Sequence, residues 1–332
     1  MRLQPRIQQP YFIFAIAAAI LSGALWTQLH VLAQTPAGTP PDSFPTAPLP
    51  GGTPPSGDPL SIVTTTPLLA DLVRQVGGPR VLVETLLPAN ADPHDYEPAP
   101  GDIRRIGAAN LVVYHGLGLD TWATALIDNA DGEFVVINST EGISTLASDE
   151  EGFGDGDPHV WFDPTLVQTI VTTLANELVD SDPEGESTYR ARATAYIDQL
   201  AALDTAIATQ IATIPAESRK LVTDHDSLAY YADRYGLEIV GTVIPSLDTR
   251  AEPSARDVAE LLEAIATANV PAIFTEQATS PGLANELADQ AGVALVDDLY
   301  IERHGPPGSG ADTYIGLMWY DTTRIVEALR GK

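Results

Sequence analysis

The sequence predicts an α/β protein with two parallel-sheet lobes joined by one long rigid helix. Short apolar runs alternate with amphipathic helical patterns in residues 60–138, and the same alternation returns after residue 220. This alternation is typical of parallel strands covered by helices on both faces. The length of 332 residues is sufficient for two domains of ordinary size.

The first 33 residues have the pattern of an export signal. Arg2 and Arg6 precede an apolar run over residues 11–26, and small residues near Ala33 are suited to cleavage. The apolar run also approaches membrane-spanning length, so an uncleaved membrane anchor is an open alternative. Either version places the rest of the chain outside the cytoplasm, in the periplasm or at the cell surface.

Residues 34–59 are dominated by Pro, Gly, Thr and Ser and lack apolar periodicity. Such a composition cannot form a core, and we expect a disordered linker that also serves as a membrane tether if the anchor is retained.

The N-terminal lobe is expected over residues 60–185. A β-rich run opens it, and each later apolar run follows a helical pattern. The expected strands are residues 60–66, 81–87, 111–114 and 134–138, and the expected helices are residues 67–76, 101–109 and 120–129.

The connecting helix is expected over residues 186–214. This stretch contains neither Pro nor Gly, and its apolar side chains recur at three- and four-residue steps. At about 1.5 Å per residue it would be about 40 Å long, which favours a stiff connection between the lobes. The C-terminal lobe follows over residues 215–332, with strands expected at 221–223, 238–244, 272–275 and 294–296.

The composition excludes several classes of function. The formal net charge is −28, from 45 acidic and 17 basic residues, and such a chain repels nucleic acid while attracting cations. The sequence contains no cysteine, which excludes disulfides, thiolate metal sites and lipid attachment through a cysteine. A bound metal ion must therefore be held by nitrogen and oxygen.

Three histidines lie in short, acid-flanked segments that are far apart in the sequence. His94 occurs in Asp-Pro-His-Asp-Tyr-Glu-Pro, His159 in Asp-Pro-His-Val-Trp-Phe-Asp-Pro, and His225 in Thr-Asp-His-Asp-Ser. Asp298, in Val-Asp-Asp-Leu, is the fourth candidate ligand, with the adjacent Asp297 as its alternative. Ligands of open parallel sheets lie beyond the carboxyl ends of strands, where these histidines can be placed.

Three imidazoles and one carboxylate form a closed tetrahedral shell that suits Zn²⁺. Mn²⁺ remains the alternative cargo, because geometry and metal supply as well as affinity determine which ion is bound. Imidazoles must be unprotonated to bind, so affinity should fall as the pH drops through about 6.5.

These segments resemble the zinc- and manganese-binding lipoproteins of metal-ion ABC importers. The likeness includes Pro-His-Asp-Tyr-Glu-Pro-Ala-Pro-Gly-Asp, His-Gly-Leu-Gly-Leu-Asp-Thr-Trp and the closing Ala-Asp-Thr-Tyr-Ile-Gly-Leu-Met, and it runs in order from about Leu60 to the C-terminus. The resemblance implies a helical-backbone receptor, with His94 and His159 from the first lobe and His225 and Asp298 from the second. It also implies delivery of the ion to an ABC importer permease, and we expect the protein to be a monomer.

Two features depart from the family pattern. Its members are usually anchored through a cysteine, which this chain lacks, and its zinc-specific members often carry a His-rich loop before the second ligand. Here that loop, residues 148–157, is short, acidic and free of histidine, and we interpret it as solvated surface.

Two other functions are compatible with the same ligands. A zinc-dependent extracellular hydrolase would keep one coordination position open for water and place a base such as Glu276 nearby. A metal buffer or adhesin would use the same site without a permease. Because four protein ligands would fill the shell, we predict a receptor and not an enzyme.

Overall fold

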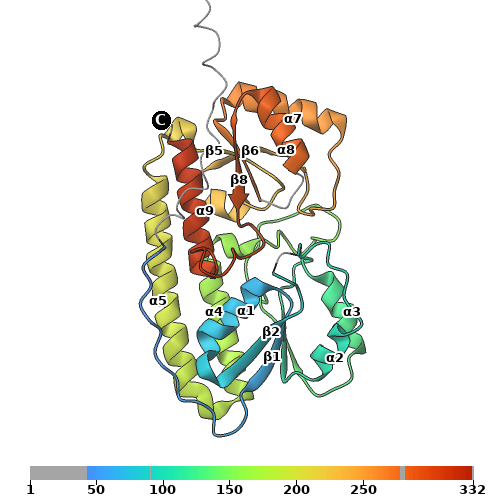
Figure 1. The fold of residues 1–332 in the computed structure, drawn as a ribbon, viewed down its shortest axis with the longest axis vertical. Helices are drawn as coiled ribbons and strands as arrows, with labels where there is room; N and C mark the ends of the chain where they lie inside the picture. Colours follow the sequence, from blue (N-terminus) through green and yellow to red (C-terminus); the bar gives the residue numbers. More distant parts are fainter. Residues whose placement is uncertain (1–42, 90, 277–280, 331–332) are drawn as a thin grey trace, which may run out of the picture. The chain divides into compact units, whose positions relative to one another are not determined.

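The computed structural model describes residues 43–332 except 90, 277–280 and 331–332, and its first lobe contains a four-stranded parallel sheet. The strand order is β2-β1-β3-β4, so the order reverses between β1 and β3. The strands are β1 (Leu60–Thr64), β2 (Val81–Thr85), β3 (Leu111–Tyr114) and β4 (Val135–Asn138) (Figure 1).

Helices cover both faces of this sheet because its strands are apolar on both sides. Along β1, Ile62 packs toward α1 and α4, whereas the next residue, Val63, packs toward α2 and α3. The helices are α1 (Pro67–Gly77), α2 (Asp102–Gly107), α3 (Thr121–Asn129) and α4 (Pro164–Ser181), with short 3₁₀ turns η1 (Gly78–Arg80), η2 (Val160–Phe162) and η3 (Pro183–Gly185).

The long helix α5 (Glu186–Ile211) is the connection expected from the sequence. It packs against α1 and α4 of the first lobe and against α6 and α9 of the second, as Figure 1 shows for α4 and α9. It ends three residues before the expected end at 214, because the chain turns ahead of Pro215 and enters the 3₁₀ turn η4 (Ala216–Ser218). Its buried side chains belong to a core that includes residues of both lobes.

The second lobe repeats the architecture of the first. Its parallel sheet has the order β6-β5-β7-β8, with α7 and α8 on one face and α6 and α9 on the other. The strands are β5 (Lys220–Thr223), β6 (Glu238–Thr242), β7 (Ala272–Glu276) and β8 (Ala294–Leu299), and the helices are α6 (Ala229–Tyr235), α7 (Ala255–Ala268), α8 (Pro281–Ala291) and α9 (Tyr314–Leu329). The predicted fold class, two parallel-sheet lobes with one long helix, is confirmed.

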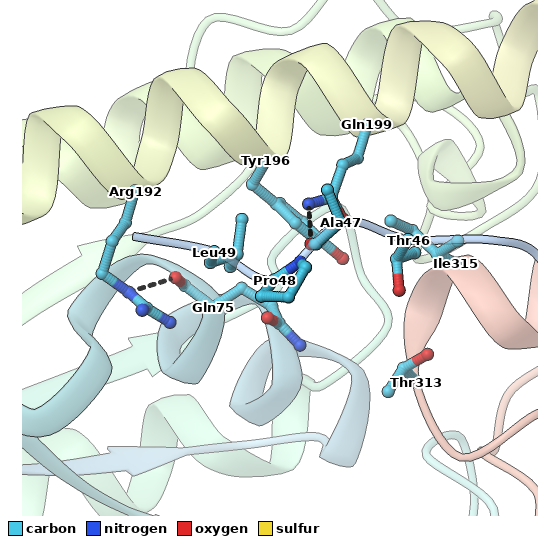
Figure 2. A pocket seen from close by; sticks show the side chains of 10 residues that line it. All are labelled: Thr46, Ala47, Pro48, Leu49, Gln75, Arg192, Tyr196, Gln199, Thr313 and Ile315. Atoms are coloured by element: carbon cyan, nitrogen blue, oxygen red, sulfur yellow. Dashed lines mark hydrogen bonds between the residues drawn. The ribbon is translucent and has the colours of Figure 1, made fainter. Parts of the chain in front are cut away.

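Residues 43–56 form an extended strap along α5, which differs from the disordered linker expected over 34–59. The side chain of Gln199 donates to the carbonyl of Ala47 (2.8 Å), and Arg192 donates to the carbonyl of Pro50 (2.7 Å). Phe44 packs against Trp319 of α9 with the two rings tilted by 58° and their centroids 5.2 Å apart. Between the strap and helices α1, α5 and α9 lies a cavity of about 320 Å³ (Figure 2).

The expected signal or anchor, residues 1–33, lies outside the described residues. Within the part of the chain that the structure describes, no helix combines the length and the apolar character needed to cross a bilayer.

Candidate metal centre

The first candidate ligand, His94, lies in the loop that follows β2. Its backbone N–H donates to the carboxylate of Asp92 (2.8 Å), and the carbonyl of Pro93 accepts from the indole of Trp122 on α3 (2.9 Å). Pro93 also restricts the backbone before the ligand. Both polar groups of the peptide bond that precedes His94 are therefore held in place, and the imidazole is buried.

His159 lies just before the 3₁₀ turn η2 and is fully buried. The carboxylate of Asp157 accepts from the backbone N–H of His159 (2.9 Å) and contacts the ring Nδ1 of His159 (2.7 Å). The ring Nε2 of His115 lies 2.7 Å from the carbonyl of Pro158 and donates to it. His115 thus supports the backbone beside His159 and does not join the cluster of candidate ligands.

His225 follows the carboxyl end of β5, and it is also fully buried. One oxygen of Asp224 accepts from the backbone N–H of His225 (2.8 Å) and lies 3.2 Å from the ring Nδ1 of His225. The other oxygen of Asp224 accepts from the backbone N–H of Glu276 at the end of β7 (3.3 Å). In His159 and His225 a carboxylate at Nδ1 leaves Nε2 available to bind a metal ion, and histidines that bind metals commonly have a carboxylate at their other ring nitrogen.

Glu302 lies beside the three histidines and is the fourth side chain of the group that could hold a metal ion. It follows the carboxyl end of β8. Three contacts hold its loop. The backbone N–H of Tyr300 donates to Asp321 on α9 (3.0 Å), and the carbonyl of Ile301 accepts from the indole of Trp161 in the first lobe (3.0 Å). The guanidinium of Arg303 donates to the buried carboxylate of Glu276 (3.0 Å).

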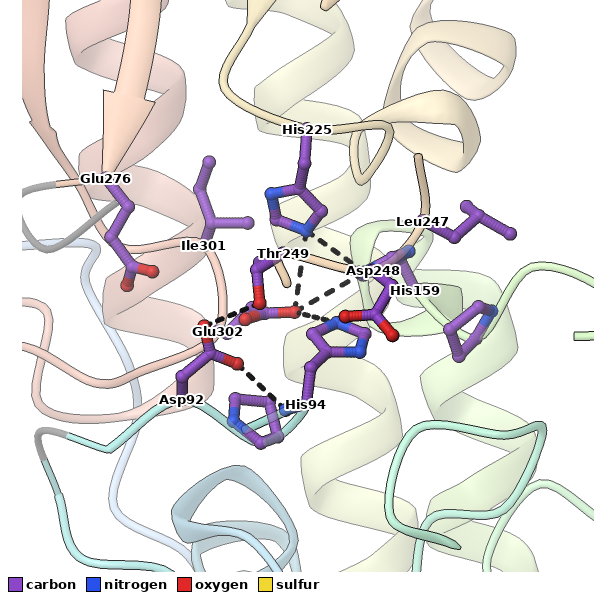
Figure 3. A network of polar contacts seen from close by, with 12 residues as sticks. Asp92, His94, His159, His225, Leu247, Asp248, Thr249, Glu276, Ile301 and Glu302 are labelled. Carbon is purple, nitrogen blue, oxygen red and sulfur yellow. Dashed lines mark hydrogen bonds and ion pairs between the residues drawn. The ribbon is translucent and has the colours of Figure 1, made fainter. Parts of the chain in front are cut away.

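The donor atoms of His94, His159, His225 and Glu302 all lie within 4.8 Å of one another (Figure 3). The Nε2 atoms of His159 and His225 are 3.4 Å apart, and they lie 3.4 and 3.5 Å from Oε1 of Glu302. A tetrahedral zinc ion with bonds of about 2.05 Å separates its donors by about 3.3 Å. These three separations match that value, whereas His94 Nε2 is closer to Glu302 Oε1, at 2.8 Å.

The structure places Asp298 away from this cluster, so the expectation that it joins the three histidines needs correction. Asp298 lies within β8 and forms an ion pair with Arg324 (3.0 Å) while accepting from the hydroxyl of Tyr320 (3.0 Å). Its neighbour Asp297 is exposed. Side chains within a strand point to the two faces of the sheet, whereas ligands bind in the crevice beyond the carboxyl ends of the strands. Glu302 lies in the loop that follows β8 and reaches this crevice.

The charges in the cluster support one another. Burial alone would raise the pKa of Glu302, but the charge of His94 and hydrogen bonds from the three imidazoles lower it well below its usual value. Burial alone would lower the pKa of His225, but the carboxylates of Asp224 and Glu302 outweigh this effect and raise the pKa well above its usual value. The pKa of His159 is raised in the same way, with Asp157 in place of Asp224. The neighbouring carboxylates thus favour positive charge at His159 and His225, the sign of charge that a bound cation would carry.

Residues 62–328 match the family model described as zinc-uptake complex component A, periplasmic. The chain belongs to this family. It is 32% identical over 275 residues to the manganese-binding lipoprotein MntA of Halalkalibacterium halodurans, which covers 82% of this chain and 89% of that protein. It is also 32% identical over 281 residues to the zinc-binding protein TroA of Treponema pallidum, with the same coverage.

The solved structure of the periplasmic zinc-binding protein TroA from Treponema pallidum superposes with a TM-score of 0.76, covering 82% of this chain and 99% of that one. Members of the family are substrate-binding receptors of metal ABC importers and not enzymes. The receptor hypothesis is thereby confirmed over the zinc-dependent hydrolase. The receptors of such importers act outside the cytoplasm, where the sequence also placed this chain.

Proposed function

We propose that this protein captures one divalent metal ion, zinc in preference to manganese, between its two lobes and delivers it to an ABC importer permease. The observation that carries the proposal is the convergence of three imidazole nitrogens and one carboxylate oxygen, contributed by four separate loops, within 4.8 Å. His94 and His159 would bind from the first lobe, and His225 and Glu302 from the second. A closed shell of four protein donors suits retention of an ion.

The preference for zinc rests on the donor set, because the names of the relatives divide between manganese and zinc. Carboxylate and water oxygens suit manganese, whereas imidazole nitrogen suits zinc. His225 supplies the third imidazole of this site. Replacing it with Glu would give two nitrogens and two carboxylates, a set better suited to manganese.

In the proposed cycle, the ion binds the ligands of both lobes, the loaded receptor docks on the permease, and docking favours release. We further propose that the protein is a monomer, for which the four ligands of a single chain suffice, and that its N-terminal segment exports it and can hold it at the membrane.

The test is metal analysis of protein purified without added metal, followed by competitive titration with zinc and manganese. We expect one equivalent of tightly bound zinc in the wild type and loss of tight binding in the double variant His94→Ala, His159→Ala. His304→Gln is a matched control, because His304 lies outside the cluster. His225→Glu should shift the preference toward manganese. Tight zinc binding retained by the double variant would reject the site.

A further inference from the structure

The loop between β6 and α7, residues 243–254, is attached to the backbone around His225. The backbone N–H of Ile244 donates to the carbonyl of Asp224 (2.7 Å), and the backbone N–H of Asp226 donates to the carbonyl of Ser246 (2.9 Å). These bonds lie on either side of His225. The β6–α7 loop therefore belongs to the second lobe and is coupled to one of the candidate ligands.

The same loop contacts the first lobe at Thr249. The hydroxyl of Thr249 donates to one oxygen of Asp92 (2.7 Å), and the other oxygen of Asp92 accepts from the backbone N–H of His94 (2.8 Å) (Figure 3). A single carboxylate thus joins the β6–α7 loop to the backbone of a ligand in the opposite lobe.

A second contact with the first lobe is made by Glu150, in the acidic loop of residues 148–157. One oxygen of Glu150 accepts from the hydroxyl of Ser246, and the other accepts from the backbone N–H of Leu247 (2.9 Å). Both oxygens of this carboxylate are therefore used across the lobes. The acidic loop as a whole was expected to be solvated surface, and Glu150 departs from that expectation, whereas its neighbour Glu151 is exposed.

The four candidate ligands are too deeply buried for an ion to enter or leave without movement. Exposure is 6% for His94, 0% for His159 and His225, and 5% for Glu302. Contacts that tie the two lobes together beside these ligands must resist any such opening. The Thr249–Asp92 contact and the contacts of Glu150 with Ser246 and Leu247 are of this kind, and all of them involve the β6–α7 loop.

We propose that Thr249 and Glu150 form a two-point latch, which holds the β6–α7 loop against the first lobe and limits the rate of metal release. This inference rests on the proposed function, because it concerns the same site. The latch contacts residues beside the ligands and leaves the four donors themselves unchanged. Breaking it should therefore speed dissociation without removing the binding site.

The test measures zinc release into an excess of chelator by stopped flow, using the full chain loaded with one equivalent of zinc. A hydrogen bond is worth about 1 kcal/mol, or about fivefold in rate, and bonds to a charged group are worth more. We expect Thr249→Val and Glu150→Ala each to raise the dissociation rate at least about fivefold. The two effects should multiply in the double variant, because the contacts are separate.

Two matched controls separate the latch from general effects. Thr249→Ser keeps the hydroxyl donor and should release zinc at close to the wild-type rate. Glu151→Ala removes the same charge from the adjacent, exposed position and should also leave the rate unchanged. The melting temperature of each metal-free variant reports whether it folds. If Glu150→Ala does not fold, Ser246→Ala breaks one of the same bonds from the other lobe and carries the same expectation.

Wild-type dissociation rates in both latch variants would overturn the latch and leave the proposed function standing. An equal acceleration in Glu151→Ala would also overturn it, since the effect would then come from charge alone. A wild-type protein that binds no zinc would overturn both the latch and the proposed function.

Discussion

At the residue scale, the sequence located the three histidines of the cluster but not its carboxylate. Each histidine has an aspartate one or two residues away, and His94 and His159 also follow a proline, so the local pattern is distinctive. Glu302 has no such context in Leu-Tyr-Ile-Glu-Arg. Its position past the end of β8 was the available signal, but that depends on the strand boundary, which periodicity fixes only to within a few residues.

Substitutions of Glu302 and Asp298 should have opposite effects on zinc binding. Glu302→Ala should weaken zinc binding by more than about 100-fold, since loss of an outer-shell partner already costs about 10- to 100-fold. Asp298→Ala should leave zinc affinity unchanged, because this side chain pairs with Arg324 on the partly exposed side of β8. Competitive titration of both variants measures the difference. A larger loss for Asp298→Ala than for Glu302→Ala would return the fourth ligand to the position expected from the sequence.

Asp321 is a buried carboxyl whose ionised form is unfavourable. Burial raises its pKa well above the usual value. Its Oδ2 has no hydrogen-bond partner among the residues that the structure describes, while Oδ1 accepts from the backbone N–H of Tyr300. The folded state therefore keeps a proton that the unfolded chain releases above pH of about 3.9. The stability that this proton provides is present below that pH and is lost as the pH rises toward the folded pKa.

Asp321→Asn keeps the oxygen that accepts from Tyr300 and removes the titration. Relative to wild type, the variant should gain up to about 1.4 kcal/mol of unfolding free energy per pH unit above about 4, until the folded pKa is passed. Urea unfolding of the metal-free proteins at several pH values measures this slope. A difference in stability that does not change with pH would show that Asp321 is ionised in the folded protein.

At the element scale, the long helix was predicted well and the strap was not. The helix is evident in the sequence because 26 residues of α5 follow a single periodicity without Pro or Gly. Residues 43–56 lack any apolar period. Two of their side chains, Phe44 and Leu49, pack against the core, and the strap is otherwise held largely through backbone carbonyls that accept from α5. Composition describes side chains, and it gives no information about carbonyl groups that accept hydrogen bonds from side chains of another element.

Arg192 on α5 should contribute to stability through this strap. Its guanidinium donates to the carbonyls of Pro50 and Gln75, at 2.7 and 2.9 Å, and so joins the strap, α1 and α5. Because hydrogen bonds to a charged group are worth about 1.5–3 kcal/mol, Arg192→Ala should lower the free energy of unfolding by about 1–3 kcal/mol.

Arg190, two residues earlier on the same helix, is the matched control. It is exposed and pairs with Glu186 one turn away, an interaction worth about 0.3–0.5 kcal/mol. Chemical denaturation of both alanine variants compares the two arginines. Equal losses would mean that the strap adds nothing to the stability of the fold.

At the scale of the whole molecule, the two lobes were predictable because strand and helix patterns alternate twice along the chain. The site between them was predictable only in part, since four loops meet there and their convergence depends on both sheets and on α5 together. The core shows why the lobes hold their places, because apolar residues of both sheets pack in one cluster with buried side chains of α5. An ion held by ligands of both lobes should therefore stabilise the molecule as one unit.

Zinc at about 100 times its dissociation constant should add about 2.7 kcal/mol to the free energy of unfolding, and the melting temperature should rise by roughly 5–10 °C in a single transition. Neighbouring carboxylates outweigh burial and raise the pKa of His159 and His225. Protons should thus compete with zinc already above pH of about 6.5, and the rise in melting temperature should shrink between pH 7.5 and 5.5. Calorimetry with and without zinc at both pH values, on wild type and His94→Ala, measures this. A rise that is the same at both pH values, or that persists in His94→Ala, would contradict ligation by these imidazoles.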